Sequence, residues 1–292
     1  MPSLKDTKRR ITSVRNTQKI THAMKLVSAA KFSRANQAVL AARPYGAAFD
    51  RIVGRLAAGV ENLENLESME LLRFVEVPKR VLAVVVSTDR GLCGSLNTNV
   101  FKAAVRYVRE NTDQGCEVDI AAMGKRAGQF YRKVGLTPMI TREKVLERPT
   151  YQSAKAITDE LSGLFTSGKY DRIVLIFSEF KNILTQTPRV KQLLPVVTPD
   201  FGDDEHDTLD FIIEPDAHTV LEGMLRKHVI NTLFRVLLEG GASEHGARMT
   251  AMDSATKNAK EYIRKLTLLY NRARQAAITK ELIEIVSGAE AV

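Results

Sequence analysis

The last 77 residues of the chain, after Pro215, contain no proline and keep a helical pattern of apolar residues to about Val286. A second helical pattern covers residues 3–58. It is interrupted only by the stretch RPYG, where Pro44 is expected to bend or locally weaken the helix. Two helical patterns of this length restrict the folds that the chain can adopt.

Helix length decides how these two segments can be placed. At about 1.5 Å per residue, about 55 residues give a helix of roughly 80 Å and about 70 residues give roughly 105 Å. A compact chain of this size has a diameter of only roughly 50 Å. Continuous terminal helices would therefore project and bury their seams against one another as an antiparallel coiled coil. The pattern leaves open whether Gly240 and Gly241 interrupt the longer helix.

The middle of the chain alternates between strand and helix patterns. Apolar runs of strand length at 80–88, 117–124 and 170–180 are separated by helical segments, which predicts βαβ units and a mostly parallel sheet. RVKQLLPVV (189–197) is expected at a sheet edge, because Pro195 cannot donate to a ladder. The predicted fold class is α/β: a long antiparallel coiled coil from the two terminal helices plus a central Rossmann-like domain.

These patterns divide the chain into three segments. Residues 1–58 and 213–292 are the two long helices, and residues 78–212 form the α/β body. Between the first helix and the body, ENLENLESMELLRF has an acid at every third position and is expected to be weakly structured.

Charge is distributed unevenly. The net charge is +9, yet residues 1–34 hold nine Lys or Arg against one acid, and residues 257–280 hold seven against one. Residues 200–216 carry eight acids and no Lys or Arg. Basic ends indicate acidic partners near the termini, whether nucleic acid, lipid or protein. The 44% hydrophobic content is typical of a globular chain, and there is no apolar run of about 18 residues to span a membrane.

Two turns resemble phosphate-binding loops but fail in detail. STDRGLCGSLN lacks G-x-G-x-x-G, and we interpret it as a βα turn capped by Asn97 or Thr98. MGKRAG is no Walker A loop, since Asp119 and Arg126 stand where Gly and Ser or Thr are required. Cys93 is interpreted as a small buried thiol, and two cysteines in the whole chain indicate a reducing compartment.

GGASEHGARM places Ser243, Glu244 and His245 in a row without the spacing of a nucleophile elbow. Neighbours on a helix point about 100° apart, so these three side chains cannot form a triad among themselves. The five histidines show no metal-ligand spacing. We therefore predict no catalytic, cofactor-binding or metal site.

The helical segment 18–37 has few large apolar residues and many alanines. Its cations, Lys19, Lys25, Lys31 and Arg34, have no acid among them. A thin seam of small residues in positive charge fits either a solvated helix face or a basic coiled coil that binds nucleic acid. The cations are spaced around the helices without interleaved aromatic residues for base stacking, which argues against nucleic acid.

The C-terminal stretch AITKELIEIVSGAEAV carries several large apolar residues, which are expected to cover more than one face of the helix: Ile278, Leu282, Ile283, Ile285 and Val286. A helix that is apolar on several sides must be surrounded. The stretch therefore implies a socket in another protein.

Four stretches, collinear over essentially the whole chain, resemble the gamma subunit family of the rotary F-type ATP synthase. They are ITSVRNTQKITHAMKLVSAAKF, STDRGLCGSLN, ASEHGARMTAMDSATKNA and YNRARQAAITKELIEIVSGA. The resemblance implies a central rotor shaft without bond chemistry. Its coiled coil would stand inside a hexamer of alpha and beta subunits, and its body and foot on the c-ring beside the epsilon subunit. Ion flow would turn ring and shaft and drive ATP synthesis or hydrolysis on the beta subunits.

The resemblance also implies roles for particular residues. The residues in segments that touch the beta subunits are Met24, Lys25, Arg274, Gln275, Thr279 and Glu281. The apolar residues that would run in the upper sleeve of the hexamer are Ile278, Leu282, Ile285 and Val286. Glu214, at the end of the acidic stretch, is the candidate foot residue for contact with the c-ring or epsilon.

The family further implies one copy per complex, no cofactor, and membrane association only through the c-ring, with H⁺ or Na⁺ as the coupled ion. Residues 181–292 contain no cysteine, so the thiol switch of the chloroplast form is not expected. No import presequence is visible, and we expect a bacterial protein peripheral to the cytoplasmic face of the inner membrane. The alternatives are a nucleic-acid-binding coiled coil, and an α/β enzyme with a ligand at the carboxyl ends of its strands.

Overall fold

The computed structural model describes residues 3–59, 69–197, 213–214 and 216–290. Contacts divide the chain into two compact units. Unit 1 consists of Met1–Ala30 and Arg248–Val292, and unit 2 of Lys31–Ala247.

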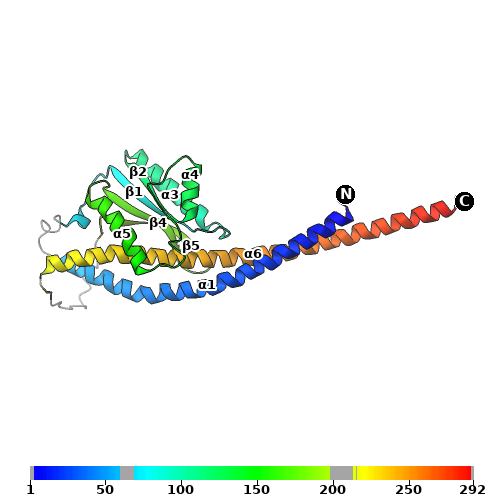
Figure 1. The fold of residues 1–292 in the computed structure, drawn as a ribbon, viewed down its shortest axis with the longest axis horizontal. Coiled ribbons are helices and arrows are strands. Elements are labelled where there is room, and N and C mark those ends of the chain that lie inside the picture. The colour runs from blue at the N-terminus through cyan, green and yellow to red at the C-terminus, as the bar shows by residue number, and fades with distance from the viewer. Residues whose placement is uncertain (1–2, 60–68, 198–212, 215, 291–292) are drawn as a thin grey trace. The chain divides into compact units, whose positions relative to one another are not determined.

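Two long helices supply residues to both units. They are α1 (Leu4–Gly59) and α6 (Ala217–Glu290), coloured blue and yellow to red in Figure 1. α1 continues through Pro44, and α6 continues through Gly240 and Gly241, which settles the question that the sequence left open. Both terminal helices are therefore unbroken.

Unit 2 contains a sheet of five strands in the order β3-β2-β1-β4-β5. β1, β2, β3 and β4 are parallel, and β5 pairs antiparallel with β4 at one edge. The bounds are β1 Arg80–Val86, β2 Glu117–Met123, β3 Ile140–Arg142, β4 Arg172–Phe180 and β5 Gln186–Leu194. The three apolar strands and the edge position of β5 are confirmed, but β5 begins at Gln186 and ends at Leu194, before Pro195. β3, only three residues long, is not among the predicted strands.

Helices cover both faces of this sheet. α3 (Leu96–Asp113) and α4 (Lys125–Lys133) lie on one face, and α5 (Tyr151–Thr166) lies on the other with the unit 2 parts of α1 and α6. Strand β1 illustrates why both faces need covering. Successive side chains of a strand point to opposite faces of the sheet, so β1 contributes apolar side chains to both. Val81, Ala83 and Val85 join the core beneath α3 and α4, and Leu82, Val84 and Val86 join the core on the α5 side. A short 3₁₀ helix, η1 (Glu70–Leu72), packs beside α5.

The turn after β1 corrects one prediction. Helix α3 begins at Leu96 with Ser95 at the N-cap position, so neither Asn97 nor Thr98 is the cap. Asn97 instead ties the turn together, since its Oδ1 accepts from the Thr88 backbone and its Nδ2 donates to the Thr88 hydroxyl. Because the Asn97 side chain closes the turn, the helix begins two or three residues earlier than a cap at Asn97 or Thr98 would require.

Unit 1 is an antiparallel helix pair with a seven-residue repeat. In α1 the buried positions include Thr7, Thr21 and Ser28, and in α6 they include Met252, Ala259 and Leu266. The Thr21 and Thr256 hydroxyl oxygens lie 2.8 Å apart, and Lys25 pairs with Asp253, so residue numbers rise along one helix as they fall along the other. A repeat of seven is the coiled-coil period. Thr21 and Ser28 make the α1 side of the seam small, whereas α6 contributes the larger Met252 and Leu266.

Candidate partner-contact surface

An ion pair joins the two helices of unit 1 beside the seam. The Lys25 Nζ lies 2.6 Å from the Asp253 Oδ1, and the Lys257 Nζ lies 2.8 Å from the Asp253 Oδ2. Hydrogen bonds from Lys25 and then Lys257 lower the pKa of Asp253 to about 2. Asp253 is therefore ionised and neutralises part of the basic helix from within the chain.

The two predicted contact residues on α1 are only partly accessible. Met24 and Lys25 are both half-buried, and the Lys25 side chain keeps 36% of its surface exposed while it pairs with Asp253. A partner can reach this ammonium group, but it meets a charge that already has a counterion.

The predicted contact residues on α6 lie where the helix pair has ended. With Thr21 beside Thr256 in an antiparallel pair, the start of α1 at Leu4 falls opposite about residue 273. Beyond that point, α6 has no α1 residue opposite it. Every side chain from Ile278 to Ser287 is exposed, including Leu282 at 58%.

These residues share one side of the helix. At about 100° per residue, all eight fall within an arc of about 160°. They are Arg274, Gln275, Ile278, Thr279, Glu281, Leu282, Ile285 and Val286. We call them the contact face. The opposite side carries the ion pair between Lys280 and Glu284, whose Nζ and Oε1 are 3.5 Å apart.

The arrangement corrects the expectation that the tip is apolar on several sides. Ile278, Leu282, Ile285 and Val286 fall within about 100° of arc, and Ile283 widens it to about 160°. The helix here is amphipathic, with a charged side that can face water. The apolar side chains of the tip therefore form one broad face of the helix.

Glu214, the predicted foot residue, is exposed and precedes α6. Residues 200–212 of the same acidic stretch lie outside the described residues.

Two of the residues weighed for catalysis, Ser243 and Cys93, serve the fold. The Ser243 hydroxyl is fully buried and donates to the Ser178 carbonyl at 3.2 Å, which ties α6 to β4. Cys93 is buried, as predicted, and accepts a hydrogen bond from Asn97. Within the described residues no three His, Cys, Asp or Glu side chains are grouped to hold a metal ion. No helix in the described part of the chain is long and apolar enough to cross a membrane.

One charged cluster in unit 2 has no counterpart among the sequence predictions. The Arg235 Nη1 lies 2.9 Å from the Asp50 Oδ2, and the His228 Nδ1 lies 3.3 Å from the Asp50 Oδ1. Burial alone would raise the pKa of Asp50, but its contacts with His228 and Arg235 outweigh burial and lower it. The cluster joins α1 to α6. No local signal reveals it, because Asp50 and Arg235 are 185 positions apart.

Taken together, the heptad seam, the exposed contact face and the α/β body define a partner-binding coiled-coil protein. An ATP synthase family model matches residues 3–292. The ATP synthase gamma chain of Geobacter sp. (strain M21) is 45% identical over 294 residues, covering 100% of this chain and 99% of that protein. The gamma chain of Pelotomaculum thermopropionicum (strain DSM 13744 / JCM 10971 / SI) is 43% identical over 292 residues and covers all of both. The chain belongs to the ATP synthase gamma chain family.

Solved structures agree on the fold. A chain of the Euglena gracilis mitochondrial ATP synthase rotor in rotational state 1 has a TM-score of 0.65 at 21% identity, covering 94% of this chain and 98% of that chain. A chain of the same synthase in an OSCP/F1/c-ring structure has a TM-score of 0.68 at 21% identity, covering 99% and 94%. The predicted family and fold class are confirmed. A gamma chain is the central-stalk rotor subunit of ATP synthase and is not itself catalytic, since catalysis lies in the beta subunits.

Proposed function

We propose that this chain transmits torque through the contact face of α6. In this proposal residues 1–58 and 213–292 form the shaft inside a hexamer of alpha and beta subunits, and residues 78–212 form the body outside it. The supporting observation is the exposed contact face, because a helix tip with apolar residues exposed by half or more needs a covering surface.

The polar part of the contact face is assigned to the beta subunits. Arg274, Gln275, Thr279 and Glu281 are all exposed and offer donors and acceptors that can exchange partners. Met24 and Lys25 join this set from α1. Lys25 keeps 36% of its side chain exposed while it pairs with Asp253, so its remaining ammonium donors can bond a partner acceptor at short range.

The apolar part is assigned to the sleeve of the hexamer. Ile278, Leu282, Ile285 and Val286 present aliphatic side chains to it. Apolar burial is non-directional, so a smooth apolar sleeve can hold the helix in many rotational positions. Directional hydrogen bonds would instead favour one position and resist rotation.

The foot and the cellular location complete the proposal. Glu214 is assigned to contact with the c-ring or the epsilon subunit, next to the start of α6. One copy of the chain would turn with the c-ring, driven by H⁺ or Na⁺, at the cytoplasmic face of a bacterial inner membrane. Its association with that membrane would be indirect, through the c-ring.

Reconstitution tests this function. We would mix the purified chain with the matching alpha and beta subunits and measure the mass of the product and its ATPase rate. The expected product holds three alpha, three beta and one copy of this chain, and hydrolyses ATP well above the subunits without it.

A folded chain that fails to assemble would contradict the proposal, and circular dichroism establishes that the chain is folded. A salt titration with duplex and single-stranded DNA tests the alternative of a nucleic-acid-binding coiled coil. Strong salt-dependent binding to DNA by a chain that does not assemble with alpha and beta would favour the alternative.

A further inference from the structure

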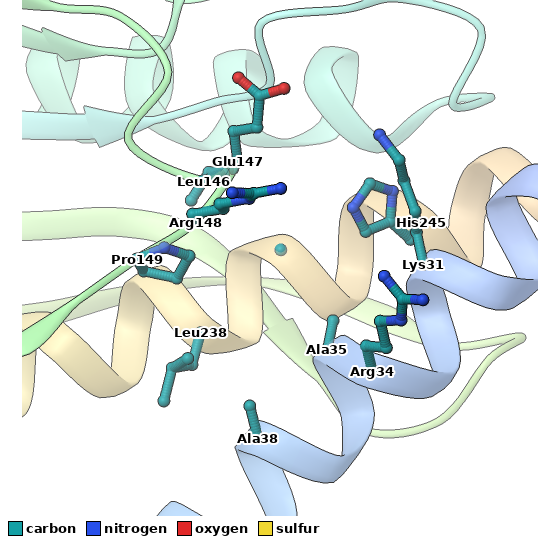
Figure 2. A pocket seen from close by; sticks show the side chains of 11 residues that line it. Lys31, Arg34, Ala35, Ala38, Leu146, Glu147, Arg148, Pro149, Leu238 and His245 are labelled. Atoms are coloured by element: carbon teal, nitrogen blue, oxygen red, sulfur yellow. The ribbon is translucent and has the colours of Figure 1, made fainter.

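A hollow of about 300 Å³ lies in unit 2 between α1, the segment that leads from β3 to α5, and α6 (Figure 2). This volume is at the lower end of the range of about 300–1,000 Å³ that is usual for small-molecule sites. The hollow shares no residue with the contact face or with Glu214, so a ligand bound in it would not occupy the proposed rotor contacts.

Small residues create the space. Ala35 and Ala38 line the α1 side, and Gly241 lines the α6 side. A Cβ at Gly241 would stand 3.3 Å from the Leu146 carbonyl oxygen, so only glycine lets this segment approach α6 without displacement. The Leu146 side chain is only 3% exposed, and its burial anchors the segment that also carries Arg148.

Cations from separate elements surround the hollow. Lys31 and Arg34 come from α1, and Arg148 comes from the segment before α5. The structure gives none of these three an ion pair among the described residues, and all three are exposed. His245 from α6 stands beside Lys31 and Arg34, and the Arg148 guanidinium reaches toward them from the opposite side (Figure 2).

The positive charge around the hollow is not balanced by acidic residues in its lining. Glu147 is the one carboxylate in the lining, against three cations. In Figure 2 its side chain points away from His245 and Arg34. Like charges around one hollow repel each other, and an anion placed among them removes that repulsion. Arg34 and Arg148 can each grip a phosphate oxygen pair in a bidentate fashion, which lysine alone cannot do.

The geometry points to this hollow as a binding site for a small phosphate-bearing anion. Two sources share that chemistry, namely free phosphate or pyrophosphate and the phosphates of a nucleotide. Leu238 and Pro149 form an apolar wall beside the cations, which a nucleotide base can cover and a free phosphate cannot.

Calorimetric titration of the full-length chain with pyrophosphate at physiological salt tests the site. We expect saturable binding, at least tenfold weaker in Arg34→Gln and in Arg148→Gln. Lys102→Gln is the matched control, because it removes one positive charge from an exposed position on α3 outside the hollow. Its affinity is expected to equal that of the wild type. All three positions are exposed, so folding should be intact, and circular dichroism checks it.

Three outcomes would overturn the site. Pyrophosphate fails to bind saturably, the Lys102→Gln control loses as much affinity as the arginine variants, or the chain binds oligoglutamate but not pyrophosphate. The last would mark the hollow as a protein-docking surface. A parallel titration with ADP separates the two sources. Tighter binding of ADP than of pyrophosphate, reduced by Leu238→Ala, assigns the site to nucleotides, and equal affinities assign it to free phosphates.

Discussion

Lys25 and Asp253 stand 228 positions apart in the chain, yet the Lys25 Nζ and the Asp253 Oδ1 are 2.6 Å apart. The pair lies beside the coiled-coil seam of unit 1, one helical turn from the Thr21 and Thr256 hydroxyls. It connects the two helices where the α1 side of the seam is made of the small polar residues Thr21 and Ser28. Such a seam buries little apolar surface, so polar contacts between the helices carry more of its specificity.

Asp253→Asn is expected to lower the stability of the helix pair at neutral pH. The pKa of Asp253 is lowered from its ordinary 3.8 to about 2, so its carboxylate stabilises the folded state above pH 3.8. That contribution is lost as the pH falls through the folded pKa. The difference between wild type and variant in the urea midpoint, followed by circular dichroism, should therefore shrink between pH 4 and pH 2.

Glu261→Gln is the matched control for this experiment. Glu261 pairs with Lys265 within a single helix at 2.9 Å, so its removal breaks a local ion pair and no contact between helices. Its effect on the midpoint should be smaller than that of Asp253→Asn. Identical midpoints for wild type and Asp253→Asn at pH 7 would refute the stabilising role of the pair.

Gly240→Val should destabilise unit 2 by about 1–3 kcal/mol through overpacking. A Cβ at Gly240 would already stand 2.9 Å from the Leu146 Cδ2, and Leu146 is buried. Gly223→Ala, in the same helix, is the control, because its Cβ would meet nothing within 4 Å. Alanine should stabilise α6 there by about 0.5–1 kcal/mol. Urea unfolding of both variants measures their free energies of unfolding. A Gly240→Val variant as stable as the wild type would show that the Leu146 segment moves to make room for the new side chain.

Asp50 and Arg235 should show a coupling free energy of about 0.5–3 kcal/mol in a double-mutant cycle of Asp50→Asn and Arg235→Gln. Both side chains are largely buried, at 24% and 27% exposed, and removal of Asp50 leaves Arg235 without this counter-charge, whereas removal of Arg235 leaves Asp50 with His228 alone. Chemical denaturation of the four proteins gives the coupling.

The exposed pair of Glu222 and Arg226, 2.9 Å apart on one helix, provides the comparison for that cycle. Its coupling should be only about 0.3–0.5 kcal/mol. Equal coupling in the two pairs would mean that the Asp50 cluster does not hold α1 to α6.

Leu282→Asp and Ile285→Asp, on the contact face, should reduce assembly with alpha and beta subunits or the ATPase rate of the complex by tenfold or more. Each puts a charge where an apolar sleeve is proposed, and an unpaired buried charge is costly. Lys280→Ala and Glu284→Ala, on the opposite side of the same helix, should assemble and hydrolyse ATP nearly as the wild type does. Equal loss on both sides would show that a socket surrounds the helix.

Local pattern is sufficient to predict most of the elements. β1 and β4 are predictable because a strand buried on both faces reads as a continuous apolar run. β3 is not, because three residues with only Ile140 buried leave no periodicity to detect. The Ser95 cap is not predictable either, since the capping rule cannot tell that Asn97 is already engaged with Thr88.

Part of the candidate site can likewise be predicted from the sequence, and part of it cannot. The apolar residues of the tip are visible in the sequence, since a run of aliphatic side chains needs no partner to be recognised. Their confinement to one broad side follows only from the continuity of α6, which remains a single helix to Glu290. The interpretation of Lys25 also changes, because its counterion is contributed by the other end of the chain.

The two long helices, the parallel strands and the family are all predictable from the amino-acid sequence, because they depend on periodicity and on short motifs of neighbouring residues. Only the tertiary structure decided that Asp253 neutralises Lys25, that Gly241 makes room for the Leu146 segment, and that Arg148 faces Lys31 across a hollow. The physical reason is distance along the chain. Contacts between residues about a hundred positions apart or more depend on how whole helices and sheets pack, and no local pattern encodes that geometry.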